Sequence, residues 1–185
     1  MSGLYLASQS PRRTELLHQV GIDHTVVTSS YVEDNVVITD PIEMVKAQAL
    51  GKARCANDVP DGSIVLGADT IVVFDGKVLG KPHSKDEART MLRTLSGQVH
   101  SVITGVALLI KGREIVFHNE TKVYFKTLQD FEIESYIDSI EPMDKAGAYG
   151  IQGKGALWVD KIVEWMGEPE LNANPIEMDK PDFST

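Results

Sequence analysis

Serines and arginines gather in the stretch SQSPRR (residues 8–13), and their types and spacing could support anion chemistry. An apolar strand-like segment precedes the stretch and a helix is expected to follow it, so free backbone N–H groups would point outward at the helix start. Together with the helix dipole these groups form an anion site, and arginine adds bidentate contacts to phosphate oxygens. The local sequence alone favours the alternative of a capped surface helix with two solvated arginines.

Asp69 is the second unusual residue, because it lies in the middle of the apolar stretch VLGADTIVV (residues 65–73). A carboxylate inside a strand is costly unless it is paired, bound to a metal or placed beside a cleft. Gly67 and Ala68 leave space next to it, as a ligand or another backbone would require. The alternative is a β-bulge in which Asp69 accepts hydrogen bonds from nearby backbone N–H groups.

Four other charged side chains lie at places where they could contact a ligand. Lys81 follows a predicted hairpin, and Lys52 lies on a predicted helix. Glu33 and Asp34 lie in a loop, where their carboxylates could help to hold a divalent cation. For each of them, an ordinary solvated position is the alternative.

A small-residue segment, DKAGAYGIQG (residues 144–153), carries the remaining polar candidates. Its glycines and alanines permit close backbone approach, while Asp144, Lys145 and Gln152 supply polar contacts. The alternative is a small-residue strand packed tightly under a helix.

Composition limits the classes of function that these residues could serve. The 185 residues carry a formal net charge of −9, so the surface would repel a nucleic-acid polymer and any bound anion should be small. With Cys55 as the single cysteine and no apolar run of membrane-spanning length, we expect a cytoplasmic protein without a membrane partner. The sequence has no P-loop, no GxSxG elbow and no histidine or cysteine spacing typical of zinc.

The elements that would position these residues alternate between strands and helices. Strands are predicted over residues 4–7, 24–28, 63–74, 77–79, 100–110, 114–126 and 156–163, with hairpin turns at Asp75-Gly76 and Lys111-Gly112. Helices are predicted from Pro11 to about Val20, from Asp40 to about Asn57, from Ser84 to Gly97 and from Thr127 to about Ser139. This order predicts an α/β protein with a mixed sheet.

Five motifs, SQSPRR, GADT, GKP, LSGQVHSVITG and DKAGAYGIQG, occur in an order and spacing that resemble the Maf family of nucleoside-triphosphate pyrophosphatases. The resemblance runs from Leu4 to about Ile162. It implies an elongated, twisted mixed β-sheet flanked by helices, with two lobes and a cleft, as in inosine-triphosphate pyrophosphatases. It also implies a cytoplasmic homodimer that hydrolyses a nucleoside triphosphate to the monophosphate and pyrophosphate with Mg²⁺ or Mn²⁺.

Three positions are similar to the branch of the family that acts on dTTP and UTP. That branch carries arginine after Ser-Pro, threonine after the catalytic aspartate and glutamine in the AYGIQG segment, which here are Arg12, Thr70 and Gln152. The 7-methyl-GTP branch tends to carry tryptophan, glutamine and glutamate instead. The resemblance therefore implies that these three residues select the base, where loss of a buried hydrogen-bond partner discriminates strongly.

The resemblance also implies roles for the other candidates. Asp69 is expected to be the general base that takes a proton from the water attacking the α-phosphorus. Glu33 is expected to hold the metal together with Asp69. A triphosphate brings about four negative charges, which an acidic protein must meet with local cations and amides. The expected phosphate-binding residues are Ser8, Ser10, Arg13, Lys52 and Lys81, and Asp144 and Lys145 are further polar contacts.

The last residues depart from the family, which usually continues into an apolar C-terminal helix. Residues 164–185 are acidic, contain three prolines and show no helical periodicity, so we expect residues 1–163 to form the pyrophosphatase domain and residues 164–185 an atypical tail. Two alternatives stay open. One is a pyrophosphatase for 7-methyl-GTP or a broad house-cleaning pyrophosphatase, whereas CTP or modified pyrimidine nucleotides would be further substrates of the expected dTTP/UTP enzyme. The other is a nucleotide-binding cell-division regulator that does not hydrolyse.

Overall fold

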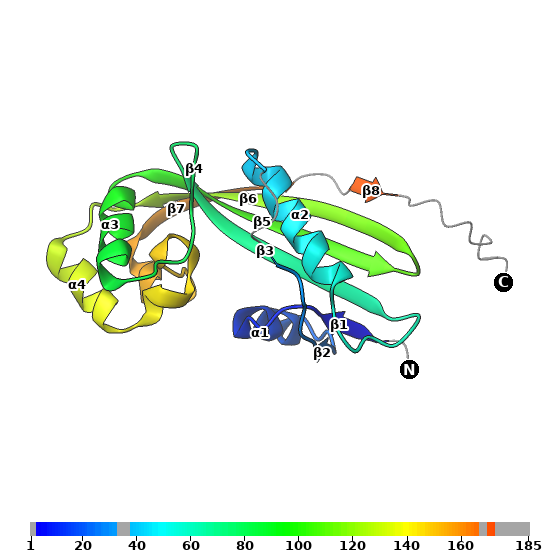
Figure 1. The fold of residues 1–185 in the computed structure, drawn as a ribbon. Helices are drawn as coiled ribbons and strands as arrows, with labels where there is room; N and C mark the ends of the chain where they lie inside the picture. The colour runs from blue at the N-terminus through cyan, green and yellow to red at the C-terminus, as the bar shows by residue number, and fades with distance from the viewer. Residues whose placement is uncertain (1–2, 33–37, 167–169, 173–185) are drawn as a thin grey trace.

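A mixed β-sheet forms the body of the protein in the computed structural model, which describes residues 3–32, 38–166 and 170–172 (Figure 1). The described strands follow the order β2-β1-β3-β5-β6-β7, with β4 paired to β3 and β8 paired to β6. β1 is parallel to both β2 and β3, whereas the other pairs are antiparallel. The strands are β1 Leu4–Leu6, β2 Thr25–Val26, β3 Ile64–Phe74, β4 Lys77–Leu79, β5 Val99–Ile110, β6 Arg113–Phe125, β7 Val159–Met166 and β8 Glu170–Asn172.

The predicted hairpins are confirmed, and their turns show why the sequence forms them. Asp75-Gly76 joins β3 to β4 with φ values of 49° and 71°, and Lys111-Gly112 joins β5 to β6 with φ values of 47° and 77°. Two consecutive residues with positive φ define the turn whose twist matches paired strands, and glycine accepts that conformation without strain.

Four α-helices accompany the sheet in the described residues: α1 Pro11–Gln19, α2 Pro41–Arg54, α3 Lys85–Leu95 and α4 Asp130–Asp138. The Asp40 carboxylate accepts hydrogen bonds from the N–H groups of Ile42 and Glu43 and so begins α2 as predicted. The capping box predicted for α3 is half formed, because Glu87 accepts from the N–H of His83 and not from that of Ser84. Among the residues that the structure describes, no helix is long and apolar enough to cross a membrane.

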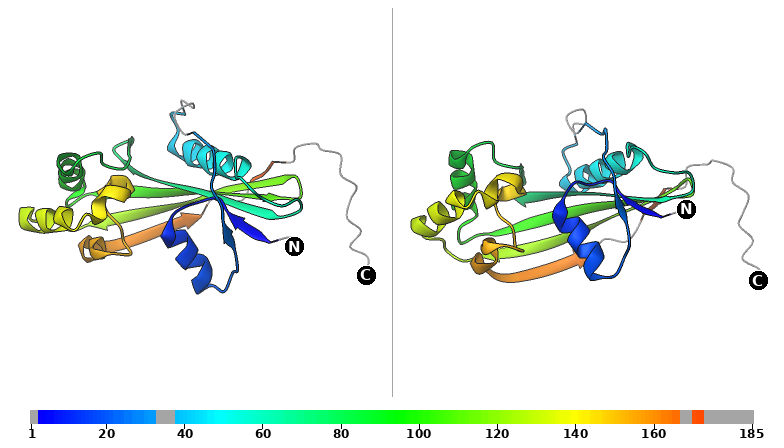
Figure 2. Two further views of the ribbon diagram at one scale, coloured as in Figure 1. Left: turned by 60° about the horizontal axis from the view of Figure 1, so that its bottom comes forward. Right: turned by 90° about the horizontal axis from the view of Figure 1, so that it is seen from below.

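Several element boundaries differ from the prediction. The helix expected to about Asn57 ends at Arg54, and the strand expected over residues 24–28 is limited to Thr25–Val26. The helix expected from Thr127 begins at Asp130, because the Glu132 carboxylate accepts from the Gln129 N–H and caps the helix there. The strand expected over residues 156–163 is displaced to Val159–Met166, because the preceding residues Lys154–Trp158 close into a 3₁₀ turn, η4. β7 therefore runs beyond residue 163 along one edge of the sheet (Figure 2).

Buried side chains divide the molecule into two lobes, one at each end of the long strands (Figures 1 and 2). The core of one lobe lies between α3, α4 and the sheet and includes Leu92, Leu95, Ile133, Tyr136 and Trp158. The core of the other lobe lies beneath α2 and includes Ala49, Ala53, Val65, Ala107 and Val116. This arrangement confirms the predicted elongated α/β fold.

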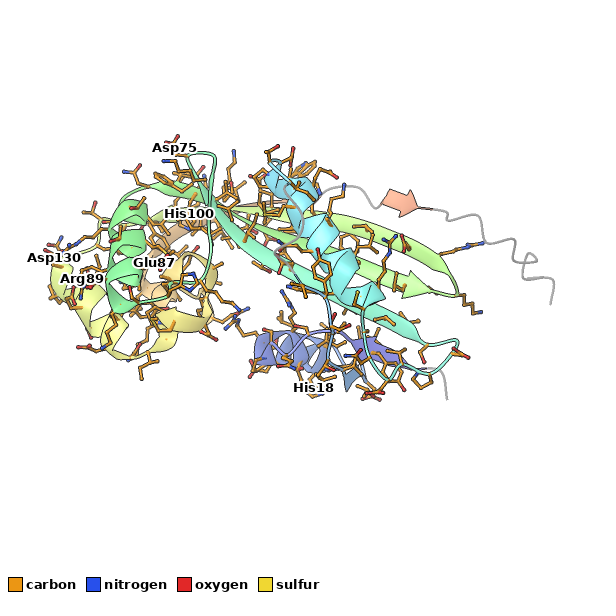
Figure 3. All side chains as sticks on the ribbon, in the orientation of Figure 1. His18, Asp75, Glu87, Arg89, His100 and Asp130 are labelled. Carbon is orange, nitrogen blue, oxygen red and sulfur yellow. The ribbon has the colours of Figure 1, made fainter. Side chains whose placement is uncertain are left out.

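His100 on β5 is a buried polar residue of the first lobe (Figure 3). Its Nε2 lies 2.6 Å from the Tyr149 hydroxyl, and its ring meets the rings of Phe125 and Tyr149 edge to face. Burial lowers the pKa of His100 to about 4, so the imidazole is neutral at physiological pH and accepts the hydrogen bond from Tyr149. His100 thereby joins the sheet to the segment that contains Tyr149.

Helix α2 lies directly on the backbone of β3 and β5, because glycine occupies the two contact points. A Cβ atom at Gly67 would overlap the carbonyl oxygen of Ala49, and one at Gly105 would overlap that of Val45. The absence of side chains at these strand positions thus sets the distance between the helix and the sheet.

Replacement of Gly67 by alanine tests this contact. We expect Gly67→Ala to lower the free energy of unfolding by about 3 kcal/mol, because the helix backbone must move away from the strand. Gly80→Ala is the matched control, since a Cβ atom there meets no atom within 4 Å, and it should change the value by less than about 0.5 kcal/mol. Urea denaturation measures both, and equal values for the two variants would contradict the contact.

Candidate active site

An interruption in strand pairing opens the edge of β3 at the centre of the candidate site. β1 pairs with β3 up to Leu66, and β4 pairs with it from Val72. Between these points, the described pairing gives residues 67–71 no strand partner on this edge. Asp69 and Thr70 lie there, and because successive strand residues point to opposite faces, they approach different helices.

Asp69 contacts Lys52 of α2. Its Oδ1 lies 2.6 Å from the Lys52 Nζ, and the two side chains are only 12% and 20% exposed. The ammonium group compensates the charge that made a carboxylate in this strand costly. The strand register stays regular through the pair Asp69↔Gly105, so the alternative of a β-bulge is wrong.

Arg13 contacts the other side of β3. Its Nη1 donates to Ser8 Oγ at 2.8 Å and its Nη2 to Thr70 Oγ1 at 3.4 Å. Burial lowers the pKa of Arg13 below its ordinary value, although the charge of Asp69 opposes the shift. Arg13 is therefore held inside the candidate site, and the alternative of a solvated arginine is wrong for it. Ser10 is the N-cap residue of α1 as predicted, but its side chain does not cap the helix.

Arg12 reaches across to the segment of residues 141–153. Its Nη1 lies 3.4 Å from Asp144 Oδ2, and Lys145 Nζ lies 2.7 Å from Asp144 Oδ1. Burial raises the pKa of Asp144, but the hydrogen bond from Lys145 and the charges of Lys145 and Arg12 outweigh it and lower the pKa overall. These contacts place Arg12, Asp144 and Lys145 in one ion cluster, in which the Asp144 side chain is exposed and the Lys145 side chain is largely covered.

The segment that carries Asp144 and Gln152 folds into 3₁₀ turns, not into a strand. η2 spans Glu141–Asp144 and η3 spans Ala146–Ala148. The alternative of a small-residue strand is therefore wrong.

Some predicted site residues do not join these clusters. Gln152 and Lys81 are exposed, and neither side chain hydrogen-bonds to another of the described residues. The backbone oxygen of Gly80 accepts a hydrogen bond from the N–H of Gly147. The backbone of the next residue, Lys81, therefore lies beside the 141–153 segment. Glu33 and Asp34 lie outside the described residues, which contain no group of three acidic, histidine or cysteine side chains suited to a metal ion.

Sequence reasoning missed three residues that support the site. The Thr104 hydroxyl lies 3.0 Å from that of Thr70, across the β3–β5 pair. Tyr136 and Glu141 hydrogen-bond to each other beside the 141–153 segment. The Glu141-Pro142 pair that begins η2 could have indicated a turn, but nothing in the sequence indicated what the Glu141 carboxylate would contact.

The fold and the site together define an α/β protein with a strand carboxylate flanked by basic side chains from two helices. Residues 3–166 match the family described as Maf-like protein, and the chain belongs to this family. Among curated relatives, it is 52% identical to the dTTP/UTP pyrophosphatase of Symbiobacterium thermophilum over 88% of this chain and 84% of the relative. It is 48% identical to the dTTP/UTP pyrophosphatase of Bacillus cytotoxicus, over 88% of this chain and 85% of the relative.

A comparison of Arg13 with Arg54, which pairs with Glu114 outside the candidate site, tests whether Arg13 serves a ligand or the stability of the fold. We expect Arg13→Met to leave the free energy of unfolding within about 1 kcal/mol of the original or to raise it, since the charge is poorly solvated. Arg54→Met should lower it by about 1–3 kcal/mol, because it leaves the buried Glu114 without its bidentate partner at 2.6 and 2.7 Å. Urea denaturation compares the two, and a larger loss for Arg13→Met would mean that Arg13 mainly stabilises the fold.

Proposed function

We propose that this chain is a nucleoside-triphosphate pyrophosphatase that hydrolyses dTTP and UTP to the monophosphate and pyrophosphate. The observation that carries the proposal is the position of Asp69 between Lys52 and the cluster of Arg13, Ser8 and Thr70. The similarity to relatives named as dTTP/UTP pyrophosphatases supports the choice of substrate.

The residues at the start of α1 and the nearby basic side chains bind the phosphates. The N-terminus of α1 offers backbone N–H groups, and Arg13 stands over Ser8 within this turn. Ser10 belongs to the same turn, and its amide donates to Ser8 Oγ at 3.2 Å. Lys52 would add a second cation next to Asp69, and Lys81 a third from the end of β4.

Asp69 acts in the reaction as general base. It accepts a proton from a water molecule, whose oxygen forms a bond to the α-phosphorus while the bond from that phosphorus to the bridging oxygen breaks. Pyrophosphate is the leaving group. Lys52 donates to Asp69 in the structure, and its transfer to the arriving phosphates would free the carboxylate for the proton.

A divalent cation would be held by few protein ligands. Asp69 is the carboxylate that contacts the basic cluster, and one or two carboxylates with substrate phosphates are the usual surroundings of Mg²⁺. Asp69 therefore fits Mg²⁺ or Mn²⁺, with Glu33 as the proposed second ligand. The ion would neutralise charge that develops on the phosphates.

Arg12, Thr70 and Gln152 are the proposed base-selecting residues. Asp144 orients Arg12 through an ion pair, and Lys145 neutralises part of the Asp144 charge. Thr70 hydrogen-bonds to Arg13, so it would couple selection of the base to the hold on the phosphates. The identities of these three residues argue against 7-methyl-GTP as the substrate, because that branch tends to carry other residue types at these positions.

We further propose that the enzyme is a cytoplasmic homodimer. The edge strand β7 supports this assembly, because Ile162, Val163 and Trp165 expose 44%, 43% and 59% of their surface. Apolar side chains gathered on a sheet edge are typical of a surface that another protein covers.

Asparagine in place of Asp69 tests the reaction. We expect wild-type protein with Mg²⁺ or Mn²⁺ to release pyrophosphate from dTTP and UTP and much less from CTP, GTP, dATP and 7-methyl-GTP. Asp69→Asn should lower kcat by about 10²–10⁴-fold, because the general base is lost.

The matched control is Asp75→Asn, which makes the same change in the exposed β3–β4 turn and should leave kcat unchanged (Figure 3). Tight binding of dTTP by wild-type protein without turnover would contradict the enzyme and favour the nucleotide-binding regulator. Faster turnover of 7-methyl-GTP than of dTTP would contradict the proposed specificity.

A further inference from the structure

The 141–153 segment and the residue before it, Ile140, have a backbone conformation that is unfavourable without contacts from the rest of the protein. Ile140 and Ala148 have φ values of 65° and 62°, in the left-handed region that β-branched residues in particular avoid. Such backbone persists only where surrounding contacts determine it, and it is frequent at ligand sites. The contacts that hold this segment therefore set the positions of Asp144 and Gln152.

Tyr136 of α4 joins two parts of the segment through its hydroxyl group. The hydroxyl donates to Glu141 Oε1 at 3.0 Å and accepts from the N–H of Gly150 at 3.1 Å. The residue is 2% exposed, and its ring packs on Trp158 with a centroid distance of 4.6 Å. One buried oxygen atom thus ties the start of η2 to the backbone two residues before Gln152.

Glu141 and Lys145 fold back onto the same stretch of backbone. A Cβ atom at Gly153 would overlap the Glu141 carboxylate, and one at Gly150 would lie 2.6 Å from Cε of Lys145. Lys145 Nζ in turn donates to the backbone oxygen of Glu141 at 2.8 Å. The glycines on both sides of Gln152 are therefore needed as contact surfaces for these two side chains.

We propose that Tyr136 and Glu141 are positioning residues for base recognition, which hold the 141–153 segment so that Asp144 directs Arg12 and Gln152 faces the base. This inference rests on the proposed function. The hydroxyl of Tyr136 contacts only this segment among the described residues, while its ring serves the core. Removal of the hydroxyl should therefore disturb recognition of the base and leave the phosphate cluster around Arg13 intact.

Tyr136→Phe tests the inference, because it keeps the ring and deletes the hydroxyl group. We expect KM for dTTP to rise at least fivefold, kcat to change less than twofold and the preference for dTTP over CTP to fall at least threefold. Inorganic tripolyphosphate has no base, so its inhibition constant should change less than twofold.

Two further variants show whether the hydroxyl contacts cause the effect. Tyr124→Phe is the matched control, because the Tyr124 hydroxyl forms no hydrogen bond with another described residue, and it should leave all these values unchanged. Glu141→Gln keeps an oxygen acceptor for Tyr136 and should stay within about twofold of wild type, whereas Glu141→Ala should reproduce the loss seen in Tyr136→Phe.

An unchanged KM for dTTP in both Tyr136→Phe and Glu141→Ala would overturn the inference. So would equal increases in the constants for dTTP and tripolyphosphate, which would indicate a general loss of structure. If wild-type protein does not hydrolyse dTTP, the proposed function fails and calorimetry on the same variants still decides the inference. Selective weakening of dTTP binding relative to tripolyphosphate would support it, and equal weakening would contradict it.

Discussion

The close contact between α2 and the glycines of β3 and β5 is the constraint on which the site depends. With Gly67 and Gly105 beneath it, the helix backbone rests on the sheet, and Lys52 reaches Asp69 at 2.6 Å. A larger side chain at either position would lift the helix and separate the ammonium from the carboxylate. Packing of α2 on the sheet therefore positions Lys52 to offset the desolvation cost of the buried Asp69 carboxylate in an apolar strand.

The second requirement is access to that carboxylate from the edge of the sheet. β1 leaves β3 after Leu66 to enter α1, and β4 joins β3 at Val72. The chain thereby places Arg13 of α1 against Thr70, while Arg12 of the same helix pairs with Asp144 of the 141–153 segment. Both lobes contribute to the candidate site, which is consistent with a ligand that has two chemically different ends.

Local signals in the sequence predicted most of the fold. The Asp40-Pro41 start of α2 and the two hairpin turns depend on interactions within a few residues, so their positions could be predicted. The start of β7 was predicted wrongly, because a 3₁₀ turn held by tertiary contacts replaces its expected first residues. For the site, the residue types predicted Arg13 and Asp69, but not the partners that hold them. Thr104, Tyr136 and Glu141 act through contacts between distant elements, which no local pattern indicates.

Hydrolysis in water labelled with ¹⁸O tests the central claim most directly, because the label marks the phosphorus atom that water attacks. With dTTP as substrate, a water molecule activated by Asp69 at the α-phosphorus must leave the label in the monophosphate and none in pyrophosphate. Mass spectrometry of the two products gives the answer. Label in pyrophosphate, or release of labelled orthophosphate, would contradict the proposed reaction.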